Sequence, residues 1–109
     1  MVTEVFTDGA CLGNPGPGGW AFVVDQGPWS SGFEPHTTNQ RMELTAASAA
    51  VQTLEGPLCV HSDSTYVVNC FVQEWWKGWL RRGWKNSKKE PVANRDLWEP
   101  FIELVNARA

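Results

Sequence analysis

Three acidic side chains carry the chemistry that this sequence suggests. Asp8 and Asp63 each follow a short β-prone run, and Glu43 lies near the start of an alanine-rich helical pattern. If the two strands are parallel neighbours, their carboxyl ends meet at one edge of the sheet, where the active sites of open α/β sheets lie. Carboxylates that stand together repel one another unless a cation binds, and hard oxygen ligands select Mg²⁺ or Mn²⁺ over zinc. Two such ions about 3.5 to 4 Å apart would suit phosphodiester cleavage.

Each acid also has an ordinary structural interpretation. Asp8 could accept hydrogen bonds from its own turn. Glu43, which we expect in the first turn of its helix, could offset the helix dipole. We expect His36 to be exposed among turn residues and His61 to be structural. No Ser-His-Asp or Cys-His arrangement emerges from these residues.

Positive charge is concentrated in one segment. The net charge is −3, yet seven of the nine basic residues lie between positions 77 and 95, whereas the first 74 residues hold one base, Arg41, and eight acids. Arg41 could contact phosphate or form an ion pair with Glu43 or Glu34. The basic segment is interleaved with four tryptophans, Trp75, Trp76, Trp79 and Trp84. The segment as a whole predicts binding to a nucleic acid, although we expect the individual tryptophans to pack inward.

The first 62 residues predict a mixed sheet. Three strands, expected over residues 2–8, 19–24 and 29–34, form an antiparallel meander. A helix follows after the capping residues 37–40, with an apolar stripe of Met42, Ala46, Ala47, Ala50, Val51 and Leu54. A fourth strand at 58–62 then pairs parallel with the first strand through a right-handed crossover.

The second half of the chain predicts helices around a charged loop. We expect helices over residues 65–74 and 75–82, a loop over 84–91, and a last helix that begins at Asn94 or at Leu97. Pro100 is tolerable if that helix begins at Leu97 and would kink it if it begins at Asn94.

Length and composition favour one domain over residues 1–109. The chain is 42% hydrophobic and has no apolar run of about 18 residues, so we expect a cytoplasmic protein without a membrane segment. Its three cysteines form no CxxC pair. We therefore expect reduced, mostly buried thiols rather than a disulfide framework or a zinc site.

Four motifs together resemble type 1 ribonuclease H of the bacterial kind. They are TDGACLGNPGPGGW at 7–20, TTNQRMELTAA at 37–47, SDSTYV at 62–67 and GWKNSKKEPVANRDLW at 83–98. Their order and spacing match that family over nearly the whole chain. The resemblance implies a ribonuclease H-like mixed α/β sheet and an endonuclease that cuts the RNA strand of an RNA–DNA hybrid, leaving 5′-phosphate and 3′-hydroxyl ends.

The resemblance also implies roles for individual residues. Asp8, Glu43 and Asp63 match the catalytic, metal-binding acids, with Gly9 beside them, and the cofactor would be two Mg²⁺ ions or Mn²⁺ in their place. Positions along the RNA strand are Cys11, Asn14, Asn39, Gln40 and Thr65, and positions near a DNA phosphate are Thr38 and Asn14. A basic protrusion at about 75–91 would grip the DNA strand through Trp75, Lys77, Arg81, Arg82, Trp84 and Lys85.

The family pattern continues past Ala109 with a fifth strand, a loop that carries a histidine, and a final helix with a fourth metal-binding Asp. We therefore expect a C-terminally truncated fold with an exposed sheet edge, completed by a second chain or by self-association if it is not a fragment. One alternative is a hybrid-binding module, or one part of a split enzyme, with impaired catalysis. A domain of a polymerase polyprotein is a weaker alternative, because the basic segment is of the bacterial type.

Overall fold

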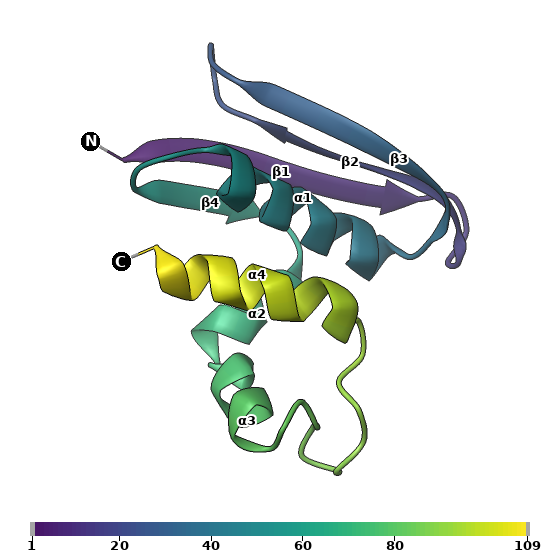
Figure 1. Cartoon of the computed structure of the whole chain (residues 1–109). Coiled ribbons are helices and arrows are strands. Elements are labelled where there is room, and N and C mark those ends of the chain that lie inside the picture. The colour runs from purple at the N-terminus through teal and green to yellow at the C-terminus, as the bar shows by residue number, and fades with distance from the viewer. Residues whose placement is uncertain (1, 109) are drawn as a thin grey trace.

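The computed structural model describes residues 2–108 and shows a four-stranded mixed sheet with four helices (Figure 1). The strands lie in the order β3-β2-β1-β4. Their bounds are Thr3–Cys11 for β1, Gly16–Val23 for β2, Trp29–Thr37 for β3 and Leu58–Ser62 for β4. Strands β1, β2 and β3 are antiparallel neighbours, and β4 is parallel to β1. The predicted α/β class and mixed sheet are confirmed.

The helices follow in the predicted order. Helix α1, Asn39–Thr53, crosses from β3 to β4 and packs on the sheet, and three further helices lie beyond the β4 side (Figure 1). These are α2 (Thr65–Val72), α3 (Trp75–Arg81) and α4 (Arg95–Ala107). No helix in residues 2–108 is long and apolar enough to cross a membrane.

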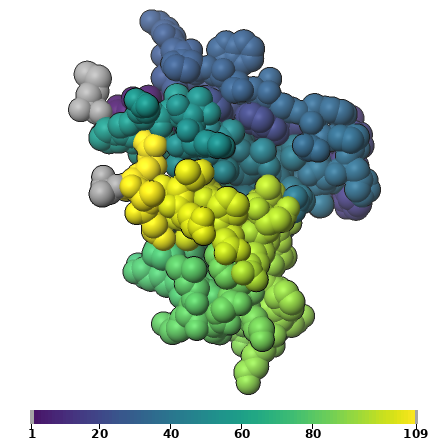
Figure 2. Space-filling model, viewed as in Figure 1, coloured from purple at the N-terminus to yellow at the C-terminus, as the bar shows by residue number. Residues whose placement is uncertain are grey.

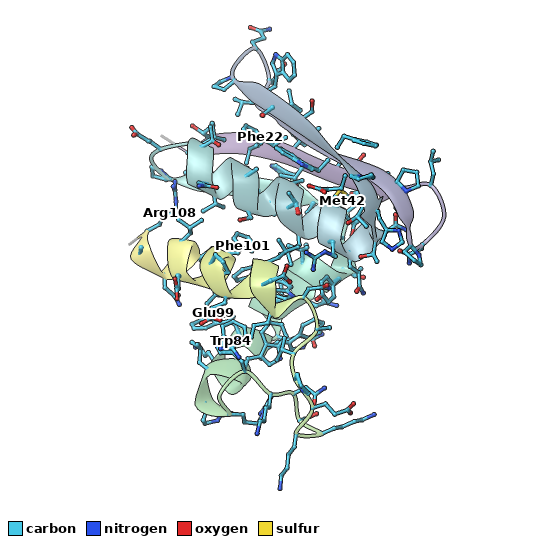
Figure 3. The ribbon with its side chains drawn as sticks, turned by 45° about the vertical axis from the view of Figure 1, so that its right-hand side comes forward. Phe22, Met42, Trp84, Glu99, Phe101 and Arg108 are labelled. Carbon is cyan, nitrogen blue, oxygen red and sulfur yellow. The ribbon has the colours of Figure 1, made fainter. Side chains whose placement is uncertain are left out.

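Small side chains let α1 lie close to the sheet. Ala46, Ala47 and Ala50 are each at most 1% exposed, and the whole predicted stripe of α1 is buried. Figure 3 shows Met42 near the start of α1 and Phe22 between the helix and the sheet. The first turn of α1 is capped by Thr38, whose hydroxyl accepts a hydrogen bond from the Arg41 backbone amide at 3.2 Å. This packing fixes where the start of α1 meets β1.

An aromatic core joins α2, α3 and α4 below the sheet. Trp98 of α4 is fully buried and contacts the rings of Tyr66, Phe71, Trp79 and Phe101, with ring centroids 5.3 to 6.2 Å apart. Such contacts between large aromatic rings bury much apolar area. They hold the basic segment at a fixed position below the sheet (Figure 2).

Several predicted boundaries are wrong. Strand β1 runs through Asp8 to Cys11, β2 begins at Gly16, and β3 extends to Thr37, because the glycine-rich stretch adopts an extended, paired backbone rather than an open loop. Helix α4, by contrast, begins at Arg95 with Asn94 as its N-cap, next to one of the two expected starts, and Pro100 lies in its second turn.

The cysteines differ from expectation in burial. Only Cys70 is buried, whereas Cys11 is half-buried and Cys59 is exposed on β4. All three are free thiols, as predicted. Burial raises the pKa of the Cys70 thiol to about 12, so that side chain stays protonated at neutral pH.

Candidate active site

Strand pairing places Asp8 and Asp63 next to each other. Thr7 of β1 pairs with Ser62 of β4 in the parallel ladder, and each acid is the next residue along the chain. Neighbouring strands lie about 4.8 Å apart. Asp63 directly follows β4, as predicted, but Asp8 does not end its strand, because β1 continues and pairs Asp8 with Ala21 of β2. Both side chains are exposed.

Gly9 brings α1 into direct contact with β1 beside Asp8. A Cβ atom at Gly9 would lie only 2.4 Å from the backbone nitrogen of Glu43 and from the carbonyl carbon of Met42. Any side chain at this position would therefore push the helix away from the strand. The glycine thus lets the Glu43 backbone contact the residue that follows Asp8, although Asp8 and Glu43 are 35 positions apart in the sequence.

Glu43 lies at a different helical position from the one expected. Because α1 begins at Asn39, Glu43 belongs to the second turn, and the first turn holds no acidic residue. The effect of the helix dipole falls off within the first turn. Compensation of the dipole is therefore a weaker explanation for Glu43, which is half-buried.

The backbone positions of the three acids converge more closely than their side chains. Val5 and Thr7 of β1 are buried under α1, so the alternation of the strand directs Asp8 to the opposite face. Its Oδ1 atom accepts a hydrogen bond from the Gly9 backbone amide at 2.9 Å. Within residues 2–108 no three His, Cys, Asp or Glu side chains are grouped closely enough to hold a metal ion.

The predicted contacts to the RNA strand gather between the β1–β2 turn and the start of α1. The Asn14 side chain accepts a hydrogen bond from the Asn39 backbone amide at 3.1 Å, which ties the turn to the helix. The Cys11 thiol lies 3.2 Å from the carbonyl of Gly16 and 3.3 Å from that of Thr37. Gln40, next to Asn39, is exposed in the first turn of α1.

Thr65 comes from a separate element but lies near Asp63 in sequence. It is the exposed first residue of α2, two positions after Asp63. Ser64 caps this helix by accepting a hydrogen bond from the Val67 backbone amide at 3.2 Å. The cap is buried, so it fixes the direction in which the chain leaves Asp63.

The ion pair of Arg41 differs from both predicted pairs. Its guanidinium makes a two-pronged contact with the carboxylate of Asp96 on α4, at 2.9 and 2.7 Å, and also donates to the Asn94 side chain at 3.2 Å. The hydrogen bonds hold the pKa of Asp96 below its usual range and raise the pKa of Arg41. Neither Glu43 nor Glu34 is the ion-pair partner.

The basic segment presents charges around a buried aromatic interior. Arg81, Arg82 and Lys85 are exposed on α3 and the following loop. Lys77 is exposed too, but its ammonium is 2.9 Å from the Glu74 carboxylate and lies over the ring of Trp76. The Arg82 Nε atom donates to the Lys85 carbonyl at 3.0 Å, which holds the loop against the helix.

The tryptophans mostly pack inward, as expected. Trp79 and Trp84 are 8% and 7% exposed and contact each other in the core. Figure 3 shows Trp84 below α4 rather than on the outer surface. Trp75 and Trp76 are half-buried. Of the two tryptophans predicted to contact substrate, Trp75 therefore offers more accessible ring surface than Trp84.

The Tyr66 hydroxyl is the centre of a hydrogen-bond network that was not predicted from the sequence. It accepts hydrogen bonds from Trp98 Nε1 at 2.7 Å and from Asn94 Nδ2 at 3.2 Å. Asn94 also contacts Arg41, so one network connects the start of α1, the start of α4 and α2. Nothing in the local sequence indicated these pairings, because the partners lie 28 to 53 positions apart.

The comparisons with known sequences agree on one family. The family model described as RNase H matches residues 1–109. A protein named Ribonuclease H from Symbiobacterium thermophilum is 53% identical over 106 residues, which cover 93% of this chain and 72% of the relative. Another of that name from Moorella thermoacetica is 52% identical over 107 residues, covering 94% of this chain and 70% of the relative.

Solved structures show the same architecture. A structure described as LC9-RNase H1, a type 1 RNase H with the type 2 active-site motif, has a TM-score of 0.80 and 29% identity, covering 99% of this chain and 59% of that one. A foamy viral protease-reverse transcriptase in complex with dsDNA has a TM-score of 0.84 over 97% of this chain and 75% of that one, at 23% identity, which shows the shared fold alone.

Proposed function

We propose that this chain, which belongs to the ribonuclease H family, is an endonuclease that hydrolyses the RNA strand of RNA–DNA hybrids. The family is shown by the match of the RNase H model to residues 1–109 and by relatives that are more than half identical. The chain spans about 70% of the length of those relatives. With a cellular nucleic acid as its substrate, we place the protein in the bacterial cytoplasm.

The contact between Gly9 and Glu43 supports this proposal most directly. It places an acid of α1 against β1, next to Asp8, while the β1–β4 ladder places Asp63 on the neighbouring strand. A structural protein gains nothing from three acids on adjoining backbone positions, because negative charges repel one another and any phosphate. A catalytic site that binds cations does gain from it.

The donor set fits magnesium. Asp8, Glu43 and Asp63 offer hard carboxylate oxygens, and the first and last are exposed. Gly9 lies beside Asp8, with its backbone packed against that of Glu43. We propose that these residues hold two Mg²⁺ ions, or Mn²⁺ as a substitute. When bound, such ions activate water and neutralise charge on the phosphate that is cleaved.

The chain's own side chains would position the RNA strand for an in-line attack that leaves a 5′-phosphate and a 3′-hydroxyl. We assign this role to the polar residues around the glycine-rich turn and the helix starts: Cys11, Asn14, Asn39, Gln40 and Thr65. They can donate to or accept from a 2′-hydroxyl, the group that distinguishes RNA from DNA. Glycines in the turn allow the sugar-phosphate backbone to approach closely.

The DNA strand would lie along the basic segment, with one phosphate near Thr38 and Asn14. Phosphate contacts would come from Lys77, Arg81, Arg82 and Lys85, whose ammonium and guanidinium groups neutralise the backbone. Trp75 would lie against the sugars or bases, and Trp84 would support it from the core. The distance between this segment and the acids sets how far the hybrid must extend to contact both.

A second candidate is a hybrid-binding module with impaired catalysis, or one part of a split enzyme. One observation favours it: the side chains of Asp8, Glu43 and Asp63 are not grouped as metal ligands in the described chain. Metal dependence separates the two candidates. A binding module holds the hybrid equally well with a chelator present, whereas the enzyme needs Mg²⁺ or Mn²⁺ to cut it.

The test uses three duplexes of the same sequence: RNA–DNA, RNA–RNA and DNA–DNA, each with one labelled strand. The proposal predicts cuts only in the RNA strand of the hybrid, in the presence of Mg²⁺ or Mn²⁺, with products that carry a 5′-phosphate. Equal cleavage of RNA–RNA, or cleavage in EDTA, would contradict it. Tight hybrid binding without cleavage in either metal would favour the second candidate.

A further inference from the structure

Tyr66 connects two parts of the proposed site. It is the second residue of α2 and follows Asp63 by three positions. Its half-buried ring lies against that of Trp75 at the start of α3, with the centroids 6.5 Å apart and the planes at 57°. Trp75 is the aromatic side chain that we place along the DNA strand. Tyr66 therefore lies on the helix that begins beside an acid and also contacts the proposed DNA-binding surface.

The Tyr66 hydroxyl holds the start of α4. It accepts hydrogen bonds from Trp98 Nε1, at 2.7 Å, and from the Asn94 side chain, at 3.2 Å. Asn94 precedes α4 in a left-handed backbone conformation, with φ at 61°. Asparagine before a helix usually accepts a hydrogen bond from an amide of the first turn, but this side chain makes no capping bond. Its amide group instead joins Tyr66 to the next residue of the network.

That next residue is Arg41, in the first turn of α1. Its guanidinium donates to Asn94 Oδ1 at 3.2 Å and to both carboxylate oxygens of Asp96 at 2.9 and 2.7 Å. Figure 1 shows that α1 and α4 begin at the same end of the molecule. Arg41 is two residues before Glu43. Direct hydrogen bonds therefore lead from Tyr66 to the helix that carries the third acid.

These hydrogen bonds restrict the helices in a way that the aromatic core does not. Apolar contacts are non-directional, so packing among α1, α2 and α4 leaves some freedom for each helix to rotate or slide. Hydrogen bonds require both short distances and favourable angles. The network thus fixes the start of α1 relative to the start of α4, where the basic segment ends.

We propose that Tyr66 is a positioning residue: through Asn94 and Arg41 it sets the place of Glu43 relative to the DNA-binding surface. This inference rests on the proposed function. A hybrid held by its DNA strand on the basic segment presents one stretch of RNA to the acids, so a displaced α1 would align a different phosphodiester or align it poorly. A misplacement of about 1 Å can reduce a rate about 100-fold.

The test compares Tyr66→Phe with the parent chain on an end-labelled RNA–DNA hybrid of fixed length, in Mg²⁺ and in Mn²⁺. The variant loses one oxygen and keeps the ring that contacts Trp75 and Trp98. We expect kcat to fall about tenfold or more and cuts to spread to neighbouring phosphodiesters. KM should change less than about twofold, because the basic segment still binds the DNA strand. Arg41→Lys keeps the charge but loses the two-pronged contact, and should change the cut pattern in the same way.

Ile102→Val is the matched control. Ile102 is 2% exposed in the same core, and its side chain cannot form hydrogen bonds, so the change loosens packing without touching the network. Circular dichroism and thermal unfolding check that all variants fold. Hydrogen exchange of the amides of residues 41–43, measured without substrate, should be faster in Tyr66→Phe than in Ile102→Val.

Three results would overturn the proposal. The first is equal exchange at the start of α1 in Tyr66→Phe and Ile102→Val. The second is a cut pattern and kcat that change no more in Tyr66→Phe than in the control. The third is that the effects of Tyr66→Phe and Arg41→Lys multiply in the double variant, as they do for independent sites. If the parent chain cuts no hybrid in either metal, the proposed function fails, and the exchange comparison alone then supports or overturns the role of Tyr66.

Discussion

The backbone of Gly9 in β1 lies directly against the backbone of Glu43 in α1, so closely that a Cβ atom at Gly9 would be 2.4 Å from the Glu43 nitrogen. This contact joins a strand to a helix at the point where both carry an acid. It requires glycine at position 9 for steric reasons, independent of any ligand. The geometry of the proposed site therefore depends on this position.

Gly9→Ala should destabilise the protein and reduce hybrid cleavage together. The new methyl group meets backbone atoms that cannot rotate away, and overpacking of this kind costs about 1–3 kcal/mol. Urea unfolding and hybrid cleavage would measure the two effects. Gly19→Ala is the control, since its Cβ meets one atom at 3.3 Å. A Gly9→Ala variant as stable and active as the parent would show that α1 does not need this contact.

The basic segment should bind the hybrid through Arg81 and Lys85. Both are exposed, and neither is in an ion pair within the described residues. Replacing both with Ala should weaken hybrid binding and reduce the salt dependence of log Kd by about one unit of slope per lost phosphate contact. Arg95→Ala is the control, because Arg95 already pairs with Glu99 at 2.9 Å. If the salt dependence of log Kd were unchanged in the double variant, the DNA strand would not lie along Arg81 and Lys85.

The Arg41–Asp96 pair should contribute to stability only above acid pH. The pKa of Asp96 is lowered in the folded state by its hydrogen bonds to Arg41. Its contribution is therefore present above the unfolded pKa of about 3.9 and is lost as the pH falls through the lower, folded value. Because the Asp96 side chain is 64% exposed, the effect should stay below about 1 kcal/mol.

Thermal unfolding of Asp96→Asn between pH 7 and pH 3 measures this contribution. The difference between parent and variant should shrink as the pH falls. Asp25→Asn, in an exposed turn, should show no such trend. A constant difference at every pH would mean that Asp96 stabilises the fold by some means other than its charge.

The three thiols should react with iodoacetamide at different rates. Cys59 is exposed and Cys11 half-buried, whereas Cys70 is buried and its pKa is raised to about 12 by that burial. Mass spectrometry of the folded protein should show labelling of Cys59 first and of Cys70 only after unfolding. The reactive species is the thiolate, so both the burial and the raised pKa of Cys70 slow its labelling. Early labelling of Cys70 would indicate that α2 opens readily.

The sequence predicted the core of the fold because its signals there are local. The alanine stripe of α1, the short apolar run of β4 and the crossover between parallel strands all follow from periodicity and length. The same reasoning placed Asp8 and Asp63 on adjacent strands, which the Thr7–Ser62 pairing confirms.

The errors lie where the outcome depends on distant partners. The extension of β1 past Asp8 depends on β2, because extended glycines pair only when a partner strand is present. Of the two roles expected for Arg41, the ion pair with Glu43 or Glu34 is wrong, because its guanidinium bonds to Asp96, 55 positions away. The three thiols were expected to be mostly buried, yet β4 is an edge strand and Cys59 on it is exposed.

The most direct test of the proposed active site is cleavage of a labelled RNA–DNA hybrid by Asp8→Asn. This change removes charge from the central acid while keeping its size. Asp25→Asn is the matched control, far from the site on the β2–β3 turn. We predict that Mg²⁺- or Mn²⁺-dependent cleavage by the parent chain is lost in Asp8→Asn and kept in Asp25→Asn. Undiminished cleavage by Asp8→Asn would contradict the assignment of these acids as the catalytic centre.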